Sequence, residues 1–522
     1  MFEFNVPVTV ARRHRPASWV CAGVCLELVV AAVVSLAGDI VHQQTFVGDV
    51  AEAKLGESVA VSGDTMVVGA SGNYGNPSSR AFVYVRRFGI WTQEAQLDPP
   101  GEHGSATDFG VRVALDEDTA IIGATLADIG PNLDQGAAYV FTRSGTTWTL
   151  QATLIASDGA ADDRFGRVSI DGDTAAIGAL YADPDGHYNQ GAAYVFTRTG
   201  GTWTQQARLT AGAAEDTFGR AVAVQGDTVI VGSATPPAGA AYVFMRSGTT
   251  WTQQAKLTAS DGGTNDELFG VSVNLDGHTA VVGAYKARTN RGFNRGAAYV
   301  FVRAGTSWSQ EAKLVADDGA PGDELGTSVA VSGNVVLATA PQADVGDEED
   351  QGVTYAFTRT GASWSQSTRV VAADAHTPGE QMQVAFDGET AVVGVPVATV
   401  NGAVSKGAAY IFWVGTSSFT DEPLTTSHLV KAVNLTELRT RIDALRGSAG
   451  LSAFAWTDAV LSPGVTVVKA VHLAELRTAL AQVYIATGQT APTYTDPTLT
   501  PGSSVVRVRH LFELRAAVRE LE

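Results

Sequence analysis

The stretch that decides the fold reads FGVSVNLDGHTAVVGA from Phe269 to Ala284 and, after a loop, GAAYVFVRAGTSWSQEAKL from Gly296 to Leu314. Copies of this unit fill residues 55 to 412, and a seventh, altered copy starts near Met382. The first six copies begin at Leu55-Gly56, Phe109-Gly110, Phe165-Gly166, Phe218-Gly219, Phe269-Gly270 and Leu325-Gly326. Repetition at a nearly fixed period indicates one structural unit copied around a common centre.

Within each unit the apolar residues have the period of strands rather than helices. In the first copy, the segments 58–61, 65–70, 81–85 and 91–97 are short, rich in β-branched or aromatic residues, and bounded by Gly, Asp and Ser turns. Four antiparallel strands repeated seven times are what a propeller needs, because each small sheet packs face to face on the next. The sequence therefore predicts an all-β fold, a seven-bladed propeller of four-stranded antiparallel blades.

Loop lengths predict which face binds a ligand. The first-to-second and third-to-fourth turns are tight, whereas the second-to-third loops and the blade-to-blade crossings are long and variable, and they share the other face. Function on a rigid scaffold tends to lie on such loops. The predicted ligand-binding residues on this face are Tyr74, Tyr181, Asp183, Asp185, Tyr188, Tyr285 and Phe293.

Phe-Gly, then Val-Val-Gly-Ala, then Gly-Ala-Ala-Tyr-Val-Phe resembles the FG-GAP repeat of integrin α-subunits and of many secreted bacterial proteins. The resemblance implies a seven-bladed propeller used for adhesion or ligand binding. Integrin-type units often carry a calcium loop of alternating Asp and Asn between the first two strands. Here that place holds only Gly-Asp-Thr, as at 63–65, or a variant such as 277–279, which leaves too few oxygen ligands to carry that site over.

Composition fits a turn-rich all-β protein. The 522 residues include 56 glycines and carry a net charge of -19, which argues against nucleic-acid binding by bulk electrostatics. Residues 1–37 are predicted to be a signal peptide, because a basic segment at 12–15 precedes an apolar run that ends in small residues. A membrane anchor is the alternative, which Glu27 disfavours by interrupting the run. Cleavage after Ala37 would remove both cysteines and leave no membrane span in the mature chain.

The seventh unit ends at 407–412 without a fourth strand of its own. Residues 53–55 resemble the missing strand, but they leave no linker to cross the blade before Gly56. Residues 43–47 fit better, so the N-terminal strand is predicted to complete the last blade of a propeller that spans 38–415.

A recurring tryptophan has a packing interpretation. A tryptophan opens the outer strand of each of six blades, from Trp91 to Trp364. Such a row can be a sugar platform, but its recurrence in each of these blades favours blade packing.

The acidic crossings suit calcium, because oxygen ligands on a Gly-rich turn match a hard cation; the alternative is a solvated turn bonded to its own backbone. The possible calcium ligands are Asp158, Asp162, Asp163, Asp216, Asp261, Asp266, Asp317 and Asp323. No other cofactor is predicted.

The C-terminal region 416–522 changes period. Asn434-Leu-Thr-Glu-Leu-Arg439 and two later copies recur at 38-residue intervals in helical patterns, which predicts a three-repeat helical module. His472 and Glu475, three residues apart, could share a metal, although Glu-Arg pairing explains the acid equally well.

Hydrolase motifs such as Gly-x-Ser-x-Gly and His-Glu-x-x-His are absent from the sequence. The leading hypothesis is a secreted or cell-surface adhesion protein that presents its loops to a protein or glycan, while the helical tail attaches to the envelope or a partner protein. The alternatives are an extracellular carbohydrate-active enzyme with a site on the loop face and a purely structural envelope scaffold.

Overall fold

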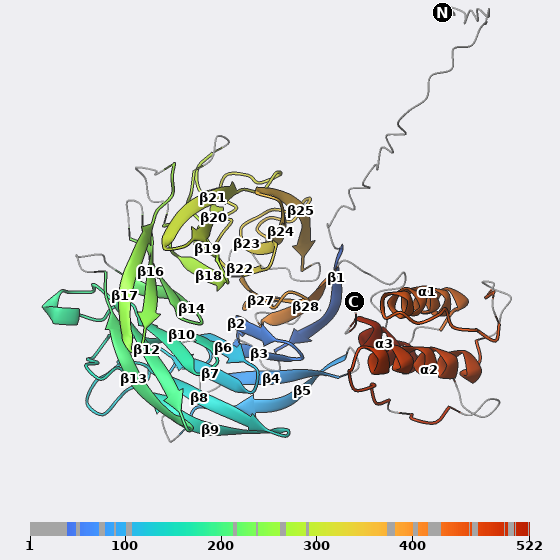
Figure 1. Cartoon of the computed structure of the whole chain (residues 1–522). Helices are drawn as coiled ribbons and strands as arrows, with labels where there is room; N and C mark the ends of the chain where they lie inside the picture. The colour runs from blue at the N-terminus through green and yellow to red at the C-terminus, as the bar shows by residue number, and fades with distance from the viewer. Residues whose placement is uncertain are drawn as a thin grey trace, which may run out of the picture. The chain divides into compact units, whose positions relative to one another are not determined.

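The computed structural model describes residues 39–48, 53–72, 79–87, 90–100, 107–211, 217–235, 239–261, 268–288, 292–372, 382–399, 406–415, 430–458, 460–461, 468–494, 496–499, 506, 508–519 and 521. The predicted signal peptide, Tyr74, Asp216 and Asp266 lie outside these ranges. Within them, 28 strands form seven four-stranded antiparallel sheets around a centre (Figure 1). The predicted seven-bladed propeller is confirmed.

The first strands of successive blades contact one another in a closed series, so they line the centre. Blade 1 comprises β2 (Leu55–Ser62), β3 (Thr65–Ala70), β4 (Arg80–Arg87) and β5 (Ile90–Leu97). Blades 2 and 3 comprise β6 (Arg112–Asp116), β7 (Thr119–Ala124), β8 (Ala137–Ser144), β9 (Thr147–Leu154), β10 (Phe165–Asp171), β11 (Thr174–Ala179), β12 (Ala192–Thr199) and β13 (Thr202–Leu209). Blades 4 and 5 comprise β14 (Phe218–Gln225), β15 (Thr228–Ser233), β16 (Ala240–Ser247), β17 (Thr250–Leu257), β18 (Ser272–Asp276), β19 (Thr279–Ala284), β20 (Ala297–Ala304) and β21 (Ser307–Leu314). Blade 6 comprises β22 (Val329–Ser332), β23 (Val335–Ala340), β24 (Val353–Thr360) and β25 (Ser363–Val371), and blade 7 comprises β26 (Gln383–Phe386), β27 (Thr390–Val395), β28 (Ala408–Gly415) and β1 (Asp39–Val47).

The second strand of a blade is apolar on both faces because it is covered on both. Every residue of β3, β7 and β11 is buried, although such short segments usually alternate in a half-exposed sheet. The outer strands β9 and β13 have several exposed residues. Burial therefore increases from the outer edge of each blade toward its middle strands.

The ring closes through the N-terminal strand, as predicted. β1 pairs antiparallel with β28, so the first and last parts of the propeller share one sheet (Figure 1). The closing strand starts before the predicted residues 43–47, at Asp39. His42 lies opposite Phe412 as Gln205 lies opposite Phe196, and each is 14 residues before the next Phe-Gly or Leu-Gly glycine. Gln43 is the bulged residue.

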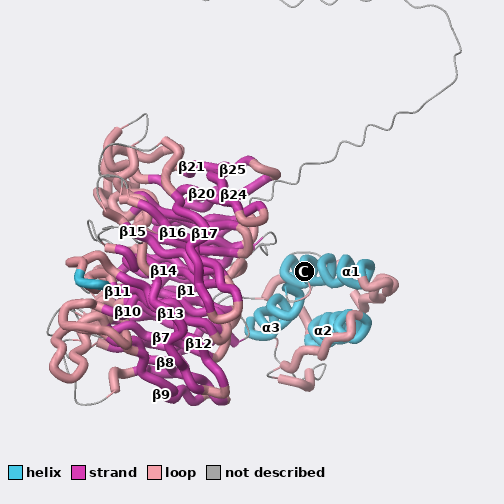
Figure 2. Tube along the Cα trace, turned by 60° about the vertical axis from the view of Figure 1, so that its left-hand side comes forward, coloured by secondary structure: helices cyan, strands magenta, loops and turns pink. Residues whose placement is uncertain are grey.

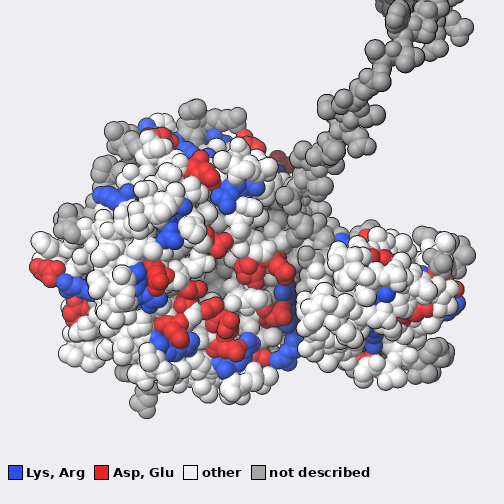
Figure 3. Space-filling model, viewed as in Figure 1, with Lys and Arg blue, Asp and Glu red and all other residues white. Residues whose placement is uncertain are grey.

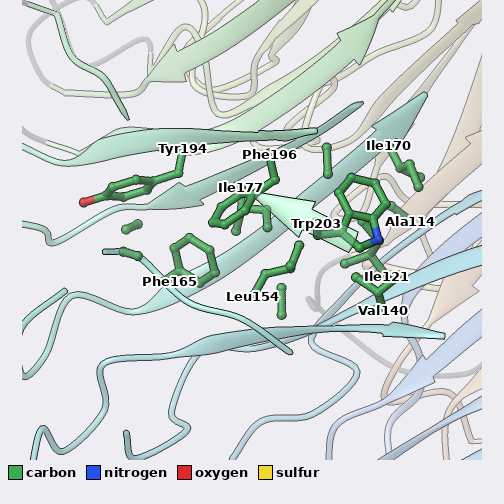
Figure 4. Close-up of a cluster of buried hydrophobic side chains, with 14 of the residues drawn as sticks. Ala114, Ile121, Val140, Leu154, Phe165, Ile170, Ile177, Tyr194, Phe196 and Trp203 are labelled. Carbon is green, nitrogen blue, oxygen red and sulfur yellow. The ribbon is translucent and has the colours of Figure 1, made fainter. Parts of the chain in front are cut away.

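The Phe of each Phe-Gly dipeptide is an anchor between blades. Between blades 2 and 3, Phe165 packs with Tyr194, Phe196 and Trp203 against Leu154 of the preceding blade (Figure 4). The rings of Phe165 and Tyr194 are 5.6 Å apart in an edge-on arrangement, which suits the charge distribution of aromatic rings. Equivalent clusters recur at other blade interfaces.

The packing interpretation of the tryptophans is confirmed. In five blades, the indole N–H of the tryptophan donates to a Gln or Glu on the outer strand of the preceding blade. An arginine of the same blade as the tryptophan lies over the indole ring. The hydrogen bonds are Trp148–Glu94, Trp203–Gln151, Trp251–Gln206, Trp308–Gln254 and Trp364–Glu311, with lengths from 2.7 to 3.3 Å. The arginine contacts run from Arg86 over Trp91 to Arg359 over Trp364. The row therefore ties neighbouring blades together.

The C-terminal helices are α1 (Ala432–Ser448), α2 (Ala470–Ala486) and α3 (Val508–Arg519). Most of their leucines, including Leu473, Leu476 and Leu480, are fully buried in a common core. The ion pairs Arg439–Glu475, Arg477–Glu513 and Arg515–Glu437 link each repeat to the next and the third back to the first. The three repeats thus form a closed module.

His472 and Glu475 have structural contacts within this module. The Nδ1 of His472 accepts from the backbone N–H of Lys469, and its Nε2 lies 2.7 Å from a carboxylate oxygen of Asp458. Asn434 accepts from Lys431 in the same way at the start of α1. The histidine therefore takes part in starting its helix, which supplies a role other than metal binding.

Candidate functional site

The loops joining second to third strands lie at the same end of the blades as the crossings. We call this surface the loop face. The backbone N–H of Phe165, at the end of one crossing, donates to the carbonyl of Gln135 in the preceding loop, and Phe218 and Leu325 repeat this bond. Figure 2 shows these loops gathered at one end of the strands, with the short 3-10 helix Pro184–Gly186 among them. The prediction that the two sets of loops share a face is confirmed.

Three large apolar side chains project into solvent from this face. Tyr188, Leu133 and Phe293 are 80%, 64% and 61% exposed and come from the loops of blades 3, 2 and 5. Their loops are held in place: in blade 3 the backbone N–H of Asn189 donates to Asp183 at 2.6 Å. Sequence reasoning found Tyr188 and Phe293 but missed Leu133, whose only signal is an isolated leucine within a polar turn.

The other predicted ligand residues have varied surroundings. Tyr181 is half-buried, with the guanidinium of Arg164 over its ring at 5.3 Å. Asp183 accepts the loop bond from Asn189, and Asp185 pairs with Arg208 at 2.9 Å. These two acids therefore stabilise the loop that carries Tyr188.

Two of the possible calcium ligands form ion pairs with the next blade. Asp158 pairs with Arg208 at 2.8 Å and Asp261 pairs with Lys313 at 2.5 Å. Lys313 and burial act in opposite directions on the pKa of Asp261, and the net shift is downward. The pairs provide cationic partners for these carboxylates.

A second pair of acids fixes the backbone of the crossings. Asp163 and Asp323 are buried, and each accepts a backbone N–H three residues earlier, at 2.8 and 2.7 Å. Burial raises the pKa of both carboxyls. Among the remaining predicted ligands, Asp162 is exposed and Asp317 donates its backbone N–H to Gln366. The calcium hypothesis stays a prediction.

A cavity of about 530 Å³ lies at the centre, lined by the beginnings of the inner strands of several blades. Tyr285, Pro341 and Gln342, from second-to-third loops, also line it, so the cavity lies at the loop-face end of the ring. Sequence reasoning placed Tyr285 on the loop face without predicting this cavity.

Five segments of the chain match the FG-GAP repeat family: residues 91–141, 148–196, 203–244, 251–301 and 308–357. The chain is an FG-GAP repeat protein. Among solved structures, a putative 6-phosphogluconolactonase from Bacteroides uniformis ATCC 8492 is similar over 60% of this chain and 85% of its own, at 11% identity and a TM-score of 0.41. No curated protein matches the chain.

This FG-GAP propeller uses the turn between its first two strands for ion pairing. Asp64, Asp118, Asp173 and Asp227 each accept from an arginine on the third strand of the same blade, at 2.6 Å. These pairs occupy the place of the calcium loop in integrin-type repeats. Figure 3 shows acidic and basic side chains lying next to one another at several places on the propeller face turned toward the viewer.

The described residues contain no group of three or more His, Cys, Asp or Glu side chains placed to share a metal ion. None of the helices in the described ranges is both long and apolar enough to cross a membrane.

Proposed function

We propose that this FG-GAP propeller is a secreted or cell-surface binding protein whose loop face holds a protein or glycan ligand. FG-GAP propellers are typical of extracellular proteins and commonly bind ligands there. The helical module at 416–522 would attach the propeller to the cell envelope or to a partner protein.

The observation that carries the proposal is the place of the exposed apolar side chains. Among the described residues of the propeller, the three large hydrophobic side chains that are more than 60% exposed all lie on second-to-third loops: Leu133, Tyr188 and Phe293. Single exposed hydrophobic residues are ordinary, but their restriction to one face of a repetitive ring is not explained by packing. Aromatic side chains also contribute much of the binding energy at interfaces.

The loops are suited to binding because they are held in place before a ligand arrives. Asp128 accepts from the backbone N–H of Asp134, and Asp183 accepts from Asn189, at 2.9 and 2.6 Å. These bonds close the loops on either side of Leu133 and Tyr188. A loop that is already ordered loses less conformational entropy on binding.

The test compares two sets of substitutions in the purified protein. The triple variant Leu133→Ser, Tyr188→Ser and Phe293→Ser removes the exposed apolar groups, and Leu150→Ser changes a 41% exposed leucine on the outer strand β9. Binding is measured on immobilised glycans and on intact cells of the producing organism. We expect the triple variant to lose at least about tenfold in apparent affinity and Leu150→Ser to bind as the native protein does. Equal binding by all three proteins would refute the assignment of the loop face.

A further inference from the structure

Three arginines lie together at the centre of the ring. Arg112 on β6 and Arg167 on β10 have the same register position in consecutive blades, opposite Gly123 and Gly178. Arg220 follows at the start of β14 in the next blade, and all three line the central cavity. The inner strands β6, β10 and β14 contact one another in sequence, which brings the arginines to one side of the cavity.

The charge along the wall of this cavity is uneven. Its other charged lining residues are Glu57 of blade 1 and Glu324 of the crossing into blade 6, and the rest are neutral. Because blades 2 to 4 supply only cations, the positive charge is concentrated on their side. A low-dielectric channel lined by one sign of charge focuses the electric field and attracts the opposite sign.

These arginines differ from four arginines near the tight turns. Arg86, Arg143, Arg198 and Arg246 form ion pairs with aspartates, such as Arg198 with Asp173 at 2.6 Å. By contrast, the buried Nε of Arg167 has no hydrogen-bond partner among the described residues. Burial, followed by the charges of Arg112 and Arg220, holds the pKa of Arg167 well below its ordinary value. Burial also lowers the pKa of Arg112, although Glu57 opposes this shift.

Gathering half-buried like charges is costly for a fold, because each guanidinium loses water and is repelled by its neighbours. Packing of the blades does not require an arginine at this position. The residue opposite the strand glycine, which is Arg112 in blade 2 and Arg167 in blade 3, is Ala221 in blade 4 and Ser272 in blade 5. Strongly shifted groups with charged neighbours in a cavity are typical of functional sites.

We propose that the central cavity binds an oxyanion, a carboxylate or phosphate group of the ligand, through Arg112, Arg167 and Arg220. A guanidinium presents paired N–H donors that match the two oxygens of a carboxylate or phosphate. Ser272 and Asn274 of blade 5 and Thr327 of the crossing into blade 6 also line the cavity and carry neutral hydroxyl and amide groups, which suit a hydroxylated ligand. The volume of about 530 Å³ lies in the range of small-molecule sites.

The oxyanion has two sources that the structure fits equally: a free small acid, or an acidic sugar at the end of a glycan held by the loop face. The second source rests on the proposed function, and the first does not. Isothermal titration calorimetry with citrate, inorganic phosphate and an oligogalacturonate separates them. Binding of citrate or phosphate indicates a free oxyanion, and binding of the oligogalacturonate alone indicates a group recognised as part of a glycan.

The single substitutions Arg112→Gln, Arg167→Gln and Arg220→Gln should each lower the affinity for the bound probe about tenfold, since each removes a charge-assisted hydrogen bond. Arg369→Gln, which breaks the exposed pair with Asp318, is the matched control and should leave binding unchanged. Glu57→Gln removes the negative charge next to Arg112 and should tighten binding several-fold. These titrations leave Leu133, Tyr188 and Phe293 unchanged, so their outcome is independent of the loop-face test.

Misfolding is excluded by melting each variant without ligand. The triple arginine variant should melt no lower than the native protein, because it relieves repulsion and burial of charge. Absence of heat with all three probes, or equal affinity in the arginine variants and in Arg369→Gln, would overturn the proposal. So would weaker binding by Glu57→Gln, because the site would then not select negative charge.

Discussion

Replacing Gly178 by Ala should destabilise the propeller through a single steric contact between blades. Gly178 lies in β11 with ordinary strand geometry, so alanine imposes no backbone strain there. A Cβ at this position would stand 2.0 Å from the carbonyl oxygen of Gly219 in the next blade. Equivalent glycines approach the next blade as closely at Gly69, Gly123, Gly232, Gly283 and Gly394. Blade 6 carries Thr339 instead, and it faces blade 7, whose Phe-Gly dipeptide is also replaced.

The size of the effect follows from the distance. Ordinary van der Waals contact begins at 3.4 Å, so the two atoms must separate by 3.4 − 2.0 = 1.4 Å. Both belong to hydrogen-bonded strands and cannot turn aside, so the blades must move apart and lose packing along the interface. Overpacking of this kind costs about 3 kcal/mol. For a propeller of roughly 380 residues the entropy of unfolding is about 0.8 kcal/mol/K, so Tm should fall by about 4 °C.

The control is Gly172→Ala, in the turn before β11. Its φ is +55°, but its Cβ would meet nothing within 4 Å, so only the backbone penalty of about 1 kcal/mol applies. Thermal unfolding followed by circular dichroism should rank the native protein first, Gly172→Ala second and Gly178→Ala last. If Gly178→Ala melts at or above the temperature of Gly172→Ala, close approach of the backbones does not limit blade packing.

Three further predictions concern ring closure, pH dependence and the helical module. Phe46→Ala removes a ring whose centroid lies 4.0 Å from that of Tyr84, across the interface between blades 7 and 1. Because the Phe46 ring is only half-buried, its loss should lower the free energy of unfolding, measured by denaturant titration, by about 2 kcal/mol. No change would mean that the side chains of β1 add little beyond its backbone hydrogen bonds. Burial raises the pKa of Asp163, so its contribution to stability is present below the unfolded pKa and is lost as pH rises through the folded pKa. On acidification from pH 7 to pH 4, the Asp163→Asn variant should therefore gain less in Tm than the native protein does. If the two proteins gain equally, the gain comes from other groups. His472→Asn should leave α2 as stable as in the native protein, because Asn434 accepts the equivalent backbone hydrogen bond at the start of α1. His472→Ala should lower the stability of the helical module by about 1 kcal/mol, measured by far-ultraviolet circular dichroism. Equal losses in the two variants would argue against a role of His472 in starting the helix.

Features that recur in every blade could be predicted from the sequence. The strand pattern and the missing fourth strand of the last unit were enough to predict seven blades and closure by an N-terminal strand. The bulge at Gln43 was not predicted, because one extra residue in a strand leaves no mark in apolar spacing. The position of the candidate binding face followed from loop lengths alone.

The arginine cluster could not be predicted in the same way. Arg167 and Arg220 directly follow their Phe-Gly dipeptides, whereas Arg112 lies one residue further from its own. The strand glycine Gly178 follows its Phe by 13 residues and Gly123 follows its own by 14, so only the observed register aligns Arg112 with Arg167. Proximity across three blades is a property of the closed ring and has no local signal.

The two ends of the ring differ in how far their side chains repeat from blade to blade. At the tight-turn end, the same arginine, aspartate and tryptophan contacts recur from blade to blade, and their charges are paired. At the loop end, Tyr188, Phe293 and the central arginines occur in some blades and not in others. A ligand without sevenfold symmetry can be oriented only by groups that differ between blades, since identical groups would bind it equally in seven orientations. The residues that depart from the repeat at the loop end are therefore the ones expected to contact the ligand.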